Sequence, residues 1–234
     1  MKMKNKKAEQ IAAKEKHREQ LKKNRRKEPT LERPEPQKDK KPTILIVCEG
    51  KNTEPSYFRK FKLSTITVEA IGEGYNTISL VERAGQLAQN KDYDQIWCVF
   101  DKDDFPVSDF NNAIAIAEAQ NFKVAYSNQA FEYWIILHLE DHQGGGMHRD
   151  DYDEKINALL KPFGVSYDGK GSKIITEEIF EILDGIDEKV NKDRAEIAIA
   201  RATRNLDNHD PGNPAMAESC TTIFKLVEEL RKHI

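Results

Sequence analysis

The sequence predicts an α/β protein in which a parallel sheet is flanked by helices and followed by a helical C-terminal addition. Three observations predict this fold class. Apolar runs alternate with helix-like segments between residues 43 and 128, which is the pattern of βαβ units. The first run is almost continuously apolar, as expected for a strand buried on both faces. After residue 128 the pattern becomes helical, and 234 residues suffice for one α/β domain with such an addition.

Four strands and three intervening helices are predicted in the first part of the folded region. The first helix begins at Thr53, which we expect to be its N-cap, with Pro55 in the first turn. The second begins at Asn76 or Thr77 after a turn at Gly72 and Gly74, and it ends near residue 90. The third runs from a cap at Ser108 to about residue 120. The strands are expected at residues 43–50, 66–71, 94–100 and 122–127.

The C-terminal part is predicted to consist of helices. Residues 130–141 place five side chains on one helical face, at the spacing i, i+3, i+4, i+7 and i+8: Phe131, Trp134, Ile135, His138 and Leu139. A loop with three consecutive glycines follows this helix. Further helices are expected at residues 151–161, 174–184, 188–205 and 214–232.

The N-terminal 42 residues differ from the rest of the chain in charge. They hold sixteen basic and seven acidic residues, a net charge of +9, whereas the remainder carries −12. Residues 8–27 predict a charged helix, and Pro29, Pro34 and Pro36 predict a linker. This segment is either an arm that binds phosphates or a solvated tail, because a run of charge fits both. We expect the folded domain to span residues 43–234.

The composition indicates a cytoplasmic protein without a membrane segment. No apolar run is long enough to cross a bilayer, and the basic N-terminus lacks the apolar stretch of a secretory signal. The three cysteines, Cys48, Cys98 and Cys220, are sparse and lack a metal-binding spacing, so we interpret them as buried thiols in a reducing compartment.

Acidic residues follow two of the predicted strands. Glu49 ends the first strand, and Asp101 and Asp103 follow the third at i, i+2 spacing. Binding sites of open parallel sheets lie at the carboxyl ends of strands, so the three carboxylates can meet there. Such a cluster repels itself unless a hard cation such as Mg²⁺ (or Mn²⁺) binds its oxygens. A carboxyl whose pKa is raised by its neighbours can also act as a general acid or base. The alternative is a set of solvated acids at strand ends.

Four segments together resemble a known protein family. VCEGKNTEPSYF and CVFDKDDF resemble the two motifs of Toprim domains, a Rossmann-like fold that binds metal in topoisomerases, primases and several nucleases. These segments, with SNQAFEYWIILH and a late NP…LV…L pattern, resemble the RloB-like family over about residues 43–232. The resemblance implies catalytic and metal-binding roles for Glu49, Asp101 and Asp103, with Asp104 as an extra metal ligand. It also implies a link with bacterial restriction or phage-defence loci and with ABC-type or AAA-type ATPases.

Four further residues are secondary candidates for the site, each with a structural alternative. Glu54 belongs to the first motif but also suits the first turn of a helix, where a carboxylate favours the helix dipole. Asn128 follows the fourth strand at the same carboxyl edge as the acids. Glu132 is a further metal-binding or water-orienting acid, or a helix cap. His138 contacts a phosphate or leaving group, or it is a core histidine on the apolar stripe.

Five basic residues are candidates for nucleic-acid contacts: Lys51, Lys170, Lys173, Arg201 and Arg204. The two later lysines lie in the turn-forming segment YDGKGSK, and the arginines lie about one turn apart on a predicted helix. Exposed turn lysines and arginines paired with acids are the alternatives.

The function indicated by these observations is metal-dependent cleavage of phosphodiester bonds in RNA, tRNA included, or in DNA, by an effector of an anti-phage or restriction-linked system. The alternative is a non-catalytic Toprim-like subunit that binds a partner ATPase. GEGYNT is not a P-loop motif, so ATP hydrolysis would have to come from such a partner. Assembly into a homo-oligomer is left open.

Overall fold

The computed structural model describes residues 3–25, 41–70, 77–103 and 106–234. In the first range, side chains are described only for residues 11–23. Contacts divide the chain into two units, residues 1–40 and 41–234. In the first unit, α1 (Met3–Arg25) is a helix whose described side chains are all exposed, and it has almost no apolar face. The predicted linker prolines lie outside the described residues.

The second unit contains a five-stranded sheet with the order β2-β1-β3-β4-β7. The first four strands are parallel, and the short β7 runs antiparallel to β4. The sheet is therefore mixed, and the predicted α/β class is confirmed. The strands are β1 (Ile44–Cys48), β2 (Ile66–Ala70), β3 (Gln95–Lys102), β4 (Lys123–Asn128) and β7 (Cys220–Thr221).

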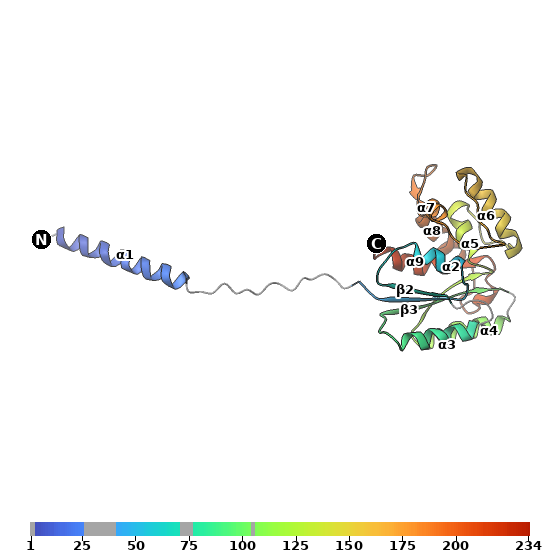
Figure 1. Cartoon of the computed structure of the whole chain (residues 1–234), viewed down its shortest axis with the longest axis horizontal. Helices are drawn as coiled ribbons and strands as arrows, with labels where there is room; N and C mark the ends of the chain where they lie inside the picture. Colours follow the sequence, from blue (N-terminus) through green and yellow to red (C-terminus); the bar gives the residue numbers. More distant parts are fainter. Residues whose placement is uncertain (1–2, 26–40, 71–76, 104–105) are drawn as a thin grey trace. The chain divides into compact units, whose positions relative to one another are not determined.

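Helices cover both faces of this sheet (Figure 1). One face packs on α3 (Thr77–Ala88) and α4 (Val107–Ala119), and its core includes Val47, Phe100 and Phe110. The other face packs on α2 (Thr53–Arg59), α5 (Glu132–Leu139) and α9 (Ile223–Arg231). The alternation of side chains along each strand sends successive residues to opposite cores, which explains the continuously apolar strand sequences.

The helical C-terminal part surrounds α5. Six consecutive residues of α5, Tyr133–His138, are buried, so burial extends beyond the predicted apolar face and the helix is enclosed on all sides. The surrounding elements are η1 (Arg149–Asp151), α6 (Tyr152–Leu160), η2 (Lys161–Phe163), α7 (Glu177–Leu183), β5 (Ile186–Asp187), β6 (Lys192–Asp193) and α8 (Arg194–Asp207).

Three sequence predictions of local structure are wrong. The helix expected at residues 188–205 begins only at Arg194, after the antiparallel pair β5 and β6. The helix expected at residues 214–232 is instead η3 (Pro214–Met216), then β7, then α9. The hydroxyls explain the strand, because Ser127 and Thr221 bond at 2.9 Å and the Thr222 hydroxyl accepts the Tyr126 N–H at 2.8 Å. The N-caps of α2 and α4 are Asn52 and Pro106 rather than Thr53 and Ser108. The predicted turn at Gly72 and Gly74 lies outside the described residues.

None of the described helices is both long enough and apolar enough to cross a membrane.

Candidate active site

Glu49 and Asp101 meet where the order of the sheet reverses. β1 lies between β2 and β3, so the connections on its two sides diverge and leave a crevice at the carboxyl ends of the strands. Glu49 directly follows β1, and its backbone N–H donates to the carbonyl of Val99 in β3 at 2.9 Å. The Asp101 backbone N–H in turn donates to Glu49 Oε2 at 3.3 Å. The two acids are therefore neighbours across adjacent strands.

Two helices bring further carboxylates to this point. Glu54 lies in the first turn of α2, only 5% exposed, and Glu132 begins α5. The Glu54 carboxylate lies against Gly50, so closely that a Cβ at Gly50 would collide with both of its oxygens. Any larger residue at position 50 would therefore force the Glu54 carboxylate to move. We call the set Glu49, Glu54, Asp101, Asp103 and Glu132 the acid edge.

Three carboxyls of the acid edge, Glu49, Glu54 and Asp101, have raised pKa values. Burial raises the pKa of Glu49 from 4.5 to about 7, with further contributions from Asp103 and Glu54. Burial also raises the pKa of Asp101 well above its usual range, and the charges of Glu54 and Glu132 add to the effect. The pKa of Glu54 is raised by burial and then by Glu132. Burial is the main physical cause in each case, and repulsion between the carboxylates adds to it.

Asp103 is held by an arginine from the helical part. Its Oδ2 lies 3.4 Å from Arg149 Nη1, while its Oδ1 is buried and has no hydrogen-bond partner among the described residues. Arg149 belongs to η1, which follows the glycine loop. The guanidinium also favours the ionised form of Glu49 and so lowers the pKa of that carboxyl, although burial outweighs it.

Tyr167 connects Glu132 to α2. Its hydroxyl donates to Glu132 Oε1 at 2.7 Å and lies 3.2 Å from Thr53 Oγ1. Tyr167 is 3% exposed, so both bonds are made in the interior. These two hydrogen bonds fix the carboxylate of Glu132 between the sheet edge and the loop that contains Tyr167.

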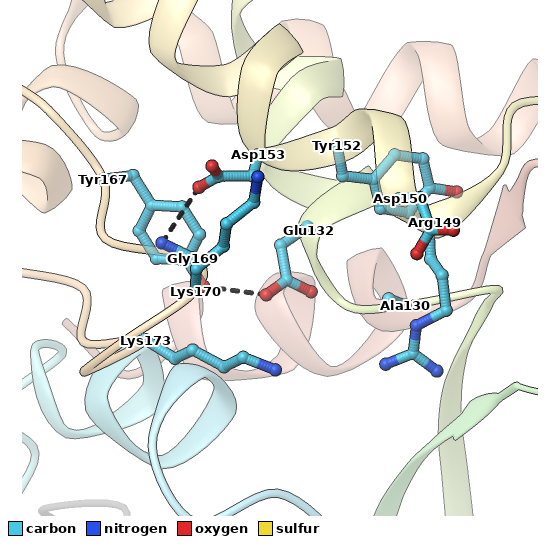
Figure 2. Close-up of a pocket in the computed structure, with 10 residues that line it drawn as sticks. All are labelled: Ala130, Glu132, Arg149, Asp150, Tyr152, Asp153, Tyr167, Gly169, Lys170 and Lys173. Atoms are coloured by element: carbon cyan, nitrogen blue, oxygen red, sulfur yellow. Dashed lines mark hydrogen bonds between the residues drawn. The ribbon is translucent and has the colours of Figure 1, made fainter.

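A pocket of about 310 Å³ adjoins the acid edge, and we call it the side pocket. Figure 2 shows the ammonium of Lys173 below the Glu132 carboxylate and the guanidinium of Arg149 to one side of it. The side pocket is lined by Ala130, Glu132, Arg149, Asp150, Tyr152, Asp153, Tyr167, Gly169, Lys170 and Lys173.

The donor chemistry of the acid edge fits a hard divalent cation. It offers only oxygen atoms, three of its carboxyl pKa values are raised, and one buried carboxylate oxygen of Asp103 lacks a partner. In the described part of the chain, however, no three acidic, histidine or cysteine side chains are arranged to hold a metal together. Binding a cation therefore requires side chains of the acid edge to rotate toward it. Asp104, predicted as an extra ligand, lies outside the described residues.

The side chains of two secondary candidates are bonded elsewhere, although Asn128 pairs with Lys102 of β3 and so lies at the same carboxyl edge as the acids. Asn128 is buried at the end of β4, but its side chain donates to the Ala215 carbonyl at 3.2 Å, on the side of η3. His138 is 1% exposed inside α5, and its Nδ1 lies 2.8 Å from the Trp134 carbonyl. Burial lowers the pKa of His138 to about 4, and the charged groups around it are Asp193, Arg201 and Arg231, not the acids. These contacts give both side chains a structural role, and their predicted roles at the site stay hypotheses.

The basic candidates separate into two groups. Arg201 donates to the Leu137 carbonyl at 2.8 Å, and Arg204 pairs with Asp141 at 2.6 Å, which fits the alternative that both hold the helical part together. Their contact with nucleic acid stays a hypothesis. Lys170 and Lys173 are exposed and line the side pocket, next to the acid edge. Lys51 is exposed beside Gly50. These three lysines keep their predicted role as a hypothesis.

Sequence reasoning missed Arg149 and Tyr167. Each lies in a loop or short turn more than thirty residues from the acid it contacts. The one available signal was composition, since Arg149 follows the glycine loop and Tyr167 begins YDGKGSK.

A family model for the RloB-like protein matches residues 44–230. The chain belongs to the RloB-like family. The match covers the whole sheet and the helical part, and it begins at the first residue of β1. Comparisons with curated proteins and with solved structures found no match.

Proposed function

We propose that this RloB-like protein is a metal-dependent nuclease with a Toprim-type site, which cleaves phosphodiester bonds in RNA, tRNA included, or in DNA. The proposal rests on one observation: Glu49 and Asp101 meet at the carboxyl ends of β1 and β3, where the order of the sheet reverses, and two helices add Glu54 and Glu132. A cluster that raises its own pKa values costs folding stability, and a bound cation would remove that cost.

The residues of the acid edge would divide the chemistry between them. Asp101 and Asp103 would hold Mg²⁺ (or Mn²⁺), with Asp104 as a further candidate ligand. When bound, the cation would neutralise the developing charge on the phosphate oxygens. Glu49, whose pKa is raised to about 7, is suited to transfer a proton near neutral pH as general base or acid. Glu132, oriented by Tyr167, would position the attacking water or hydroxyl.

The cellular role we propose is that of an effector in a bacterial anti-phage or restriction-linked system. Support comes from the family membership and from the resemblance of the motifs. In this setting the nuclease would act with an ABC-type or AAA-type ATPase as its partner. The basic N-terminal segment, with its net charge of +9, would offset repulsion between the acidic body and nucleic acid.

The test replaces Glu49 by glutamine, which keeps the shape and removes the charge. Wild type and Glu49→Gln are expressed in bacteria with the neighbouring genes, and growth and nucleic-acid integrity are followed after phage challenge. We expect fragments from wild type and a loss of about a hundredfold or more in the variant. Purified proteins are then compared with Mg²⁺ and with a chelator.

The matched control is Glu69→Gln, an exposed glutamate on β2 outside the acid edge. It should cleave like wild type. If the folded Glu49→Gln protein cleaves nucleic acid as well as wild type does, the acid edge is not catalytic. If wild type and variant both protect cells without any cleavage, a non-catalytic subunit that binds the ATPase becomes the better account.

A further inference from the structure

Two basic side chains, Arg149 and Lys173, line the side pocket and also interact with carboxylates of the acid edge. Arg149 lies 3.4 Å from Asp103 and lines the side pocket. Lys173 also lines the side pocket, and its charge favours the ionised form of Glu54. Five carboxylates of the acid edge are thus balanced in part by two cations from the helical part.

The backbone of Arg149 is fixed while its side chain is free to change partner. Its N–H donates to Gln129 Oε1 at 2.8 Å, which ties η1 to the end of β4. The nearby Met147 N–H donates to Ser219 Oγ at 3.1 Å. The ion pair itself is open to solvent, with side-chain exposures of 34% for Arg149 and 31% for Asp103. Pairs of this exposure contribute little to stability, so the guanidinium can leave Asp103 at low cost.

The acids of the side pocket leave its basic residues available for an anion. Glu132 already accepts the Tyr167 hydroxyl, and Asp153 accepts the Gly169 N–H at 3.0 Å. Asp150 is mostly exposed and faces His148. The volume of about 310 Å³ has room for a phosphate with its sugar. A guanidinium fork matches phosphate oxygens in pairs, which a lysine cannot do.

We propose that Arg149 exchanges partners during substrate binding: it neutralises Asp103 in the free protein, and it turns into the side pocket to bind a substrate phosphate when a divalent cation occupies the acid edge. Lys173 binds the same phosphate, which neighbours the one that is cleaved. A cation at Asp103 would repel the guanidinium, and the side pocket, which Arg149 already lines, would offer it the substrate phosphate as a partner. This inference rests on the proposed function and adds a substrate-binding residue to it.

The first experiment measures cation binding without any substrate. The full chain is titrated with Mn²⁺, and the free ion is followed by electron paramagnetic resonance. Arg149→Gln removes the competing charge and should bind Mn²⁺ on the order of tenfold more tightly than wild type. Arg149→Lys keeps the charge and should bind with an affinity close to that of wild type. Arg204→Gln, which breaks the pair with Asp141 far from Asp103 in the chain, should bind Mn²⁺ as wild type does.

The second experiment measures substrate binding with the same variants. The probe is a short fluorescent oligonucleotide, as RNA and as DNA, with Ca²⁺ as the cation, and binding is followed by anisotropy. Arg149→Gln should bind the oligonucleotide about tenfold more weakly in Ca²⁺ and close to wild type without it. Arg149→Lys should also lose affinity in Ca²⁺, because it lacks the fork.

The outcomes separate this inference from the proposed function. Tighter Mn²⁺ binding together with weaker oligonucleotide binding in Arg149→Gln supports the exchange. If wild type binds Mn²⁺ and Arg149→Gln binds it equally, or if oligonucleotide binding is unchanged, the exchange is wrong and the nuclease proposal stands. If neither protein binds Mn²⁺, the metal site and the exchange are both wrong. Circular dichroism confirms that each variant is folded.

Discussion

The acid edge and the ion pairs of the helical part use the same residue types in opposite ways. In the helical part, Arg231 pairs with Asp184 at 2.5 Å and with Asp193 at 2.7 Å. Arg204 pairs with Asp141 and lowers the pKa of that carboxyl. At the acid edge, carboxylates outnumber the basic side chains near them, and the pKa values of Glu49, Glu54 and Asp101 are raised.

The comparison distinguishes charged residues that stabilise the fold through ion pairs from charged residues whose burial destabilises it. The pairs of Arg231 and Arg204 join elements that are far apart in sequence, so folding alone explains them. The acid edge destabilises the folded state at neutral pH, and folding gives no reason for it. Sites that break the rules of stability in this way are the usual places of binding and catalysis.

The largest effect on stability is expected where an arginine serves two acids. Arg231→Ala leaves Asp184 and Asp193 without their cation at the end of α9 and removes two short charged hydrogen bonds that are only partly exposed. We therefore expect a loss of about 2–3 kcal/mol in the free energy of unfolding. Urea denaturation at neutral pH measures it. Lys232→Ala, next to it, removes an exposed pair with Glu229 and should leave stability nearly unchanged. Equal effects of the two variants would contradict the structural role of the Arg231 pairs.

At the acid edge, removing a charge is expected to raise the free energy of unfolding rather than lower it. The pKa of Glu54 is raised above its usual 4.5 because burial and Glu132 disfavour its charge. The folded state therefore holds the proton more tightly than the unfolded chain, and Glu54 lowers stability as the pH rises above 4.5. Glu54→Gln should be more stable than wild type by about 2 kcal/mol at about pH 8, and the gain should vanish near pH 4.

Thermal unfolding across this pH range measures the effect, and about 2 kcal/mol corresponds to a rise in Tm of roughly 4–8 °C for a chain of this size. The amide keeps an oxygen for the backbone N–H groups of Gly50 and Glu54, so little packing is lost. Glu69→Gln, on the exposed side of β2, should show no such gain. A less stable Glu54→Gln protein at about pH 8 would mean that the acid edge is neutralised within the chain.

The sequence predicted the sheet and the first two acids because these depend on short segments. β1 and β3 are apolar runs, and Glu49 and Asp101 come at their ends, so strand adjacency places them together. The strand β7 was missed because it is two residues long and forms only against β4. Periodicity cannot show a pairing of that length.

The basic residues of the site were harder to predict because tertiary packing selects them. Arg201 and Arg149 are both arginines in or near helices, and only the structure shows that one meets the Leu137 carbonyl and the other Asp103. The Glu132 partner Tyr167 reaches α5 from a loop beyond α6 and η2. No local pattern predicts such contacts.

The smallest effect is expected at His138, which tests where the boundary of the site lies. Burial lowers the pKa of His138 to about 4, so the folded state holds its proton less tightly than the unfolded chain. Wild type should lose stability through His138 as the pH falls from about 6.5 toward 4, and His138→Leu should not. In urea denaturation the variant should gain about 1 kcal/mol relative to wild type between about pH 7.5 and pH 5. Metal-dependent cleavage should be unchanged, because His138 faces Trp134 and the charged groups of α8 and α9. If the folded His138→Leu protein does not cleave, the catalytic site includes His138 of α5. The separation between the acid edge and the ion pairs of the helical part would then be wrong at this residue.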